Sequence, residues 1–171
     1  GSGSSQYFDG YLTTSTDSIA SSGVYIDMIL DVQREIDTSY YTHIAGTAAV
    51  EIDVADRYLV EGRITFNQTT GNSRSESNMR LVIDTGSGFT EVPGTLGYIY
   101  HRNNTQGSGT VSISCVLSLN PGDQIKIQAQ RVSGAATLAF VENACSLSII
   151  TFRGQKGLDG AQGPTGSGST I

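Results

Sequence analysis

Glycine recurs at every third position near the C-terminal end of this chain. The positions are Gly154, Gly157, Gly160, Gly163 and Gly166. In a collagen triple helix three polyproline II strands wind together, and every third residue lies at a crowded axis that admits only hydrogen as a side chain. The repeat therefore predicts a collagen-like segment over residues 154–166, with these glycines at the axis of the triple helix. Since a triple helix needs three chains, it also predicts an assembly of three copies. A solvated Gly-rich linker is the alternative.

Four triplets with one proline, Pro164, are too short to hold three chains together alone. We therefore expect a trimeric domain beside them. Residues 23–153 leave room for one core domain, the head. A Ser-, Gly- and Thr-rich arm over residues 1–22 precedes it, and a flexible linker over residues 167–171 follows the repeat. The chain starts with Gly rather than Met and stops after a Gly/Ser stretch, so we expect both ends to be cut from a longer protein.

Apolar and polar residues alternate along most of residues 23–153 with the period of two typical of β-strands. One such run predicts a strand over residues 24–33, and polar loops are expected at 67–77 and 101–109. Gly62, inside another run, predicts a bulge or a close backbone approach. About nine or ten short strands without a convincing helix predict an all-β antiparallel sandwich or barrel. The candidate core residues are Tyr58, Val60, Ile64, Phe66, Leu81, Ile83, Ile113, Leu117, Ile125 and Ile127.

Several strands are apolar on their second face as well. The residues concerned are Leu59, Val82, Val116 and Ile150. Packing between the subunits of a trimer would cover them, and scattered surface apolar side chains are the alternative. The arm also carries an aromatic cluster, Tyr7, Phe8 and Tyr11, which we expect to dock, for instance on a neighbouring subunit.

Charge and apolar patterning exclude several classes of partner. The net charge is −6, which argues against nucleic acid and against an anionic membrane surface. No apolar run is long enough to span a bilayer, and no signal-peptide pattern is present. Cys115 and Cys145 share the phase of apolar neighbours, so we expect buried free thiols, with a disulfide between late strands as the alternative.

No catalytic or metal-binding pattern stands out, and we expect no enzyme activity and no cofactor. His43 and His101 have no nucleophile marked beside them and are expected at a surface or an interface. The acidic residues are dispersed, not paired as in a glycosidase. The densest acidic stretch, with Asp27, Asp31, Glu35 and Asp37, leaves a calcium site open as an alternative, although no calcium-loop ligand pattern supports it.

Three segments resemble the trimeric jelly roll shared by the globular head of the first complement component and tumour necrosis factor. They are residues 57–66, 79–83 and 111–127. The last contains a Leu-x-x-Gly-Asp turn motif before an Ile-rich strand, here Leu119, Gly122 and Asp123. The resemblance covers roughly residues 24–152. It implies an antiparallel jelly-roll sandwich that forms a homotrimer.

The likeness is closer to phage versions of this head, in virion fibres and capsid decorations. The pairs Gln130-Arg131 and Ser133-Gly134 resemble the sequence that leads to the final strands there, and Gly166-Ser-Gly-Ser169 resembles the end of short collagen-like runs in phage structural proteins. Two features depart from the complement relatives. The collagen-like segment follows the head instead of preceding it, and the core contains few aromatic residues.

These observations predict a non-enzymatic structural protein of a phage virion. It would be a trimeric fibre or capsid-decoration head at the virion surface, with other capsid or tail proteins as partners and a role in attachment to the host surface. One alternative is a receptor-binding module that recognises a host-surface glycan or protein through the 67–77 and 101–109 loops. Another is a secreted complement-type ligand, with which the sequons at Asn67 and Asn103 are compatible.

Overall fold

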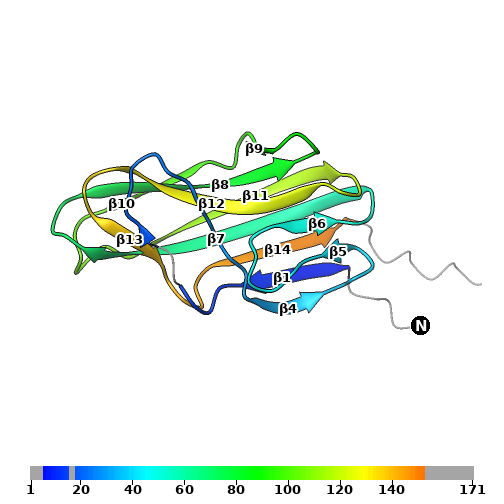
Figure 1. The fold of residues 1–171 in the computed structure, drawn as a ribbon, viewed down its shortest axis with the longest axis horizontal. Helices are drawn as coiled ribbons and strands as arrows, with labels where there is room; N and C mark the ends of the chain where they lie inside the picture. Colours follow the sequence, from blue (N-terminus) through cyan, green and yellow to red (C-terminus); the bar gives the residue numbers. More distant parts are fainter. Residues whose placement is uncertain (1–5, 16–17, 153–171) are drawn as a thin grey trace, which may run out of the picture.

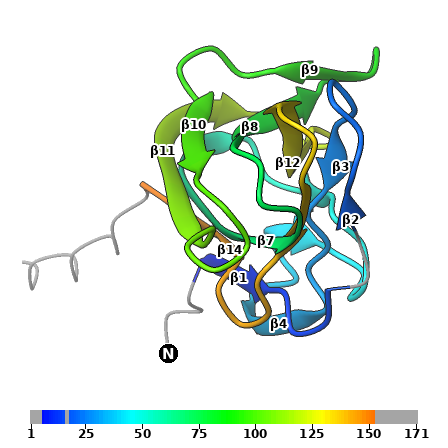
Figure 2. The same cartoon turned by 90° about the vertical axis from the view of Figure 1, so that its left-hand side faces the viewer.

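The computed structural model describes residues 6–15 and 18–152, which form two packed antiparallel sheets (Figures 1 and 2). Sheet A contains β1 (Tyr7–Tyr11), β2 (Ser18–Ile19), β4 (Val32–Ile36), β7 (Asp56–Thr70), β11 (Gly109–Leu119), β13 (Thr137–Phe140) and β14 (Ser146–Thr151). Sheet B contains β3 (Ile26–Asp27), β5 (Tyr41–Thr42), β6 (Val50–Ile52), β8 (Ser75–Asp84), β9 (Phe89–Glu91), β10 (Gly97–His101) and β12 (Gln124–Ser133). Nine of these strands have four or more residues. In the described part of the chain, no helix is long and apolar enough to cross a membrane.

The long strand β7 organises sheet A. It pairs with β11 on one side and with β14 on the other, and β1 and β4 extend the sheet beyond β14. Near its C-terminal end β7 pairs with β13 instead of β14. In sheet B the order is β10, β8, β12, β6 and β5, with β3 on β12 and β9 on β8. All of these pairings are antiparallel, as the sequence predicted.

The inward faces of the two sheets form one core. Of the candidate core residues, Ile83 and Leu117 are half-buried and pack against that core. The other eight are buried: Tyr58, Val60, Ile64, Phe66, Leu81, Ile113, Ile125 and Ile127. Gly62 marks a close approach of the sheets, because a Cβ placed on it would lie 2.3 Å from Cδ1 of Ile127. The close approach expected at this glycine is therefore confirmed.

The strand predicted over residues 24–33 is wrong as one element. The chain forms β3 on sheet B, leaves the ladder, and joins sheet A as β4. Between these strands it spans the sandwich, with Met28 and Leu30 buried. The alternation that suggested one strand arises because every second side chain points into the same core, although the backbone changes sheets.

The polar loop predicted at residues 67–77 is also mostly strand, since only residues 71–74 lie outside β7 and β8. The polar side chains of Gln68, Ser75 and Ser77 point inward and are buried. Gln68 donates to the carbonyl oxygens of Gly71 and Ser73, at 2.7 and 3.0 Å, and accepts from Ser75. Ser77 bonds to His101. Because all three side chains have hydrogen-bond partners within the subunit, polar residues occupy core positions here.

The aromatic cluster of the 1–22 segment docks on its own subunit. Phe8 is fully buried in the core, and β1 lies between β14 and β4. The expectation that this cluster docks is therefore confirmed for Phe8, which docks within its own subunit and not on a neighbouring one. The glycines of the collagen-like repeat, residues 154–166, lie outside the described residues.

Candidate subunit interface

The solvent face of sheet A carries a row of apolar side chains that crosses four strands. Tyr7 on β1 pairs with Ile150 on β14, Ile150 pairs with Leu59 on β7, and Leu59 pairs with Val116 on β11. Their chain neighbours Phe8, Ile149, Val60 and Cys115 point into the sandwich, so the four side chains share the outward face. Tyr7 and Val116 are 44% and 50% exposed, and Leu59 and Ile150 are half-buried. We call these four residues the apolar row.

Charged residues flank the apolar row along β7. Glu61 and Arg63 follow Leu59 on the same face and are exposed. Neither forms an ion pair with another described residue. On β1, Asp9 already forms an ion pair within the subunit, since a guanidinium nitrogen of Arg34 lies 2.8 Å from its Oδ2. With Arg57, which precedes Leu59 on this face and is exposed, β7 offers one acid and two bases that form no ion pair with a described residue.

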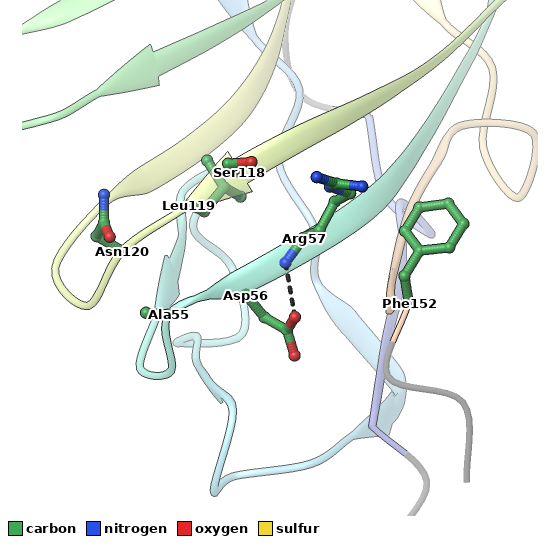
Figure 3. A pocket seen from close by; sticks show the side chains of 7 residues that line it. All are labelled: Ala55, Asp56, Arg57, Ser118, Leu119, Asn120 and Phe152. Carbon is green, nitrogen blue, oxygen red and sulfur yellow. Dashed lines mark hydrogen bonds between the residues drawn. The ribbon is translucent and has the colours of Figure 1, made fainter. Parts of the chain in front are cut away.

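On the other side of the row, sheet A ends in a shallow hollow (Figure 3). The ends of β7, β11 and β14 meet there, and the backbone N–H of Phe152 donates to the carbonyl oxygen of Arg57 at 3.0 Å. Phe152 is 54% exposed. The hollow is lined by Ala55, Asp56, Arg57, Ser118, Leu119, Asn120 and Phe152. A second hollow, which includes Tyr7, Leu59 and Ile150 in its wall, lies on the same face.

The sequence predicted His101 at a surface or an interface, but the structure buries it within the subunit, at the end of β10. Its Nδ1 lies 2.6 Å from the carbonyl oxygen of Gly107, which can only accept, so Nδ1 carries the proton. Its Nε2 lies 2.6 Å from Oγ of Ser77, whose hydroxyl then donates to it. Burial lowers the pKa of His101, and the bond to Gly107 opposes this in part. Through these two hydrogen bonds, a neutral His101 links the 102–108 loop to β8.

His43 is half-buried and makes local contacts. Its ring packs edge-on against Phe8, with 5.1 Å between the centroids, and its Nδ1 lies 2.8 Å from the Gln33 amide. Its Nε2 lies 3.0 Å from the carbonyl oxygen of Thr47. His43 and His101 therefore hold loops in place, on opposite sides of the core.

Both cysteines are free, as expected, with Cys145 buried and Cys115 half-buried. Burial raises the pKa of both thiols, which favours the protonated and less nucleophilic form.

The four carboxylates of the acidic stretch have separate surroundings. Asp27 pairs with Lys126 at 2.8 Å, Asp31 accepts from Thr13, and Asp37 accepts from Ser39. Glu35 is exposed on β4. Within residues 6–15 and 18–152, no group of three or more His, Cys, Asp or Glu side chains could hold a metal ion.

The turn motif joins β11 to β12. Leu119 is buried at the end of β11, and Asp123 accepts from the backbone N–H of Asn120 at 2.8 Å. Gly122 has a φ of 91°, which favours glycine. The motif closes the hairpin at the end of the molecule where Phe152 lies.

No protein-family model matches the sequence, and no curated protein matches it. Solved structures do match. Murine APRIL is 12% identical over 85% of this chain and 97% of that chain, with a TM-score of 0.56. Eiger TNF from S. frugiperda is 12% identical over 96% of this chain and 99% of that chain, with a TM-score of 0.57. The globular domain of zebrafish complement 1qA is 13% identical over 86% and 97%, with a TM-score of 0.52.

The fold is that of the tumour necrosis factor and complement C1q heads. The resemblance inferred from residues 57–66, 79–83 and 111–127 is thus confirmed at the level of fold, as is the all-β jelly-roll class. Within this TNF/C1q fold, Leu59, Val116 and Ile150 were noted from the sequence as apolar on a second face. Tyr7 was not placed beside them, because no sequence pattern gives the register of β1 on β14. The fourth residue of that sequence set, Val82, is fully buried within the subunit, where β8 pairs with β9.

Proposed function

We propose that the chain is a non-enzymatic head that assembles as a homotrimer through the solvent face of sheet A. The apolar row is the observation that carries this proposal. An apolar row that crosses four strands is unfavourable in water, and burial against a second copy removes it from water. The unpaired Glu61 and Arg63 beside it suit arginine–carboxylate pairs between subunits. The TNF/C1q fold supports the trimer, because the resemblance inferred from the sequence is to trimeric heads.

In this arrangement the head gathers three collagen-like segments. Phe152, the last described residue, lies at the end of sheet A on the same face as the apolar row. Three faces that meet around one axis would bring three copies of residue 152 close together. That arrangement lowers the entropic cost of forming a short triple helix from the 154–166 repeats.

We further propose that this head belongs to a phage virion, as a fibre or capsid-decoration unit at the particle surface. The Gly-x-x repeat and the Gly166-Ser-Gly-Ser169 ending, similar to those of phage structural proteins, support this role. Antibodies raised against the head should label particles of the virus that encodes it in electron microscopy. Label confined to infected cells, with bare particles, would contradict the virion location.

The trimer is tested by the solution mass of the full chain in light scattering. We expect three times the 18.0 kDa of one chain. Leu59→Asp should give the mass of one chain, because three unpaired carboxylates would be buried at the interface. Ile44→Asp is the matched control, since Ile44 is 71% exposed in the 43–47 turn, away from the apolar row. A parent monomer, or equal dissociation in both variants, would refute an interface on sheet A.

A second candidate function is recognition of a host-surface glycan. The 102–108 loop favours it, because the sequence there is Arg-Asn-Asn-Thr-Gln-Gly-Ser, rich in amide and hydroxyl groups. This loop is held by His101 and by Asn103, whose Oδ1 accepts from the backbone N–H groups of Thr105 and Gln106 at 3.0 and 2.8 Å. A fixed polar loop loses little conformational freedom when it binds.

A further inference from the structure

Two exposed tyrosines lie on β10, at the edge of sheet B. Tyr98 and Tyr100 are 56% and 55% exposed, and alternate along the strand with the half-buried Ile99 and the buried His101. Their rings therefore project from the same face of the strand, about 7 Å apart along it. Exposed tyrosines offer apolar ring faces and a polar hydroxyl to a ligand. An aromatic surface beside the 101–109 loop was not predicted, because the two tyrosines belong to the preceding strand.

Two arginines adjoin this surface at the end of the sandwich where β8 begins, here called the tip. This end of β8 lies on the left of Figure 1. The last register pair of β8 and β10 is Ser75 with His101, so the next residues outward are Arg74 and Arg102. Both are exposed. Each arginine directly adjoins one strand of this pair, so both positive charges belong to the same end of the sheet edge, where one anionic ligand could reach both.

The other cations on sheet B already have partners. Arg131 on β12 is buried and donates to Oγ of Ser22 and to the carbonyl oxygen of Ala136. Arg80 pairs with Glu91 at 3.4 Å and lies over the ring of Tyr25, with its Cζ 3.5 Å from the centroid. Lys126 pairs with Asp27 at 2.8 Å and lies 4.1 Å from the centre of the Phe89 ring.

Arg74 and Arg102 have no ion pair and no ring contact with any described residue. The nearest carboxylate in the register is Glu76, opposite Tyr100, and it pairs with neither arginine. One acid against two bases leaves this corner positive in a chain whose net charge is −6.

We propose that Tyr98, Tyr100, Arg102 and Arg74 form a binding strip for an acidic polysaccharide. The guanidinium groups bind the carboxylates of acidic sugars in bidentate pairs, and the tyrosine rings pack against the apolar faces of the sugar rings. Amide and hydroxyl groups of the adjoining 102–108 loop bind the sugar hydroxyls. At physiological ionic strength charges act over about 8 Å, so the local arginine pair outweighs the negative charge of the rest of the chain.

The polar, fixed loop favours a sugar chain over an acidic peptide, since a peptide would also require an apolar pocket for its side chains. The strip rests on the glycan-recognition candidate above and does not depend on the trimer. If the head is trimeric, each trimer carries three strips, which would raise the avidity for a repeating polymer without any new contact.

Binding is tested with the full chain and two forms of one polymer on a biolayer interferometer. Polygalacturonate carries a carboxylate on each sugar, and its methyl ester has the same backbone without the charge. We expect binding to polygalacturonate that weakens with added salt, and at least tenfold weaker binding to the ester. Equal binding to both polymers, or to neither, would overturn the proposal.

Variants locate the site. Arg102→Gln and Arg74→Gln should each weaken binding to polygalacturonate about tenfold, and Tyr100→Ser should weaken it as well. Arg34→Gln is the matched control, because it removes the same charge from an exposed arginine on sheet A, and it should bind like the parent. Equal loss in Arg34→Gln would mean unspecific charge attraction and would refute the strip.

Light scattering of the same variants separates this proposal from the trimer. The variants should keep the mass of the parent. If Arg74→Gln or Tyr100→Ser dissociates the parent assembly, the strip is a contact between subunits, and its role as a ligand site is refuted while the trimer stands.

Discussion

The close approach of the sheets at Gly62 makes a quantitative prediction about the core. In Gly62→Ala the new Cβ would lie 2.3 Å from Cδ1 of Ile127 and 3.1 Å from Cγ1 of Ile113. Overpacking of this kind costs about 1–3 kcal/mol. Replacing glycine by alanine also reduces the conformational freedom of the unfolded chain, which stabilises the folded state by about 0.4–1 kcal/mol and offsets part of that cost. We therefore expect Gly62→Ala to lower the free energy of unfolding by about 1–2 kcal/mol.

A second substitution identifies the atom responsible. Ile127→Val removes Cδ1, the atom nearest to the new Cβ, and costs about 0.5–1.5 kcal/mol alone. The double variant Gly62→Ala with Ile127→Val should then be more stable than the sum of the single effects predicts, by about 1 kcal/mol. Ile125→Val is the matched control, since the same change two residues away on β12 leaves the close contact in place.

Urea unfolding gives the free energies by linear extrapolation. All variants are compared at one protein concentration, because assembly adds to the apparent stability. Strict additivity of Gly62→Ala with Ile127→Val, or equal coupling with Ile125→Val, would refute the inference that the contact with Cδ1 determines the spacing of the sheets at this point.

Three further predictions concern other parts of the chain. Because burial lowers the pKa of His101, its contribution to stability is complete above the unfolded value of about 6.5 and is lost as the pH falls below it. The melting temperature of His101→Gln should therefore change less between pH 7 and 5 than that of the parent; equal slopes would exclude His101 as the source. The half-buried Cys115 should react with a thiol reagent faster than the buried Cys145, as single Cys→Ser variants would show, and the reverse order would contradict the burial described. Gly160→Val should loosen the collagen-like segment in circular dichroism without lowering the melting temperature of the head, and a large drop would show that the two parts are not independent.

Strict alternation predicted the strands that stay in one ladder. β11, β12 and the part of β7 up to Phe66 have one face in the core, so the period of two is visible in the sequence there. β8 departs from that period, because Asn78 and Val82 are buried on its other face. The segment between β3 and β4 shows the limit of this signal, because side chains keep alternating while the backbone crosses between sheets. The polar interior around Gln68 shows a second limit, since composition alone cannot tell inward hydrogen-bonded residues from a loop.

The candidate interface could be predicted only in part. Apolar residues on a second face were visible at Leu59, Val116 and Ile150, but their alignment in one row depends on the register of β7 with its neighbours. Tyr7 joins them through one further pairing, with Ile150, which is 143 residues away in the chain. The placement of Arg74 and Arg102 at the same end of one strand pair likewise follows from the register of β8 and β10, which the sequence does not show.

The neighbouring antiparallel strands β1 and β14 give this head a convenient architecture for engineering. Tyr7 opposes Ile150, so the chain enters and leaves the sandwich at one end, about one strand spacing of 5 Å apart. A linker of a few residues could join positions 6 and 152 and so give a circular backbone. New ends could then be opened at the 85–88 turn, where a Cβ on Gly86 or Gly88 would meet no atom within 4 Å. The same geometry would let the head be inserted as a cassette into an exposed loop of another protein, with both connections at its base and the opposite tip left free.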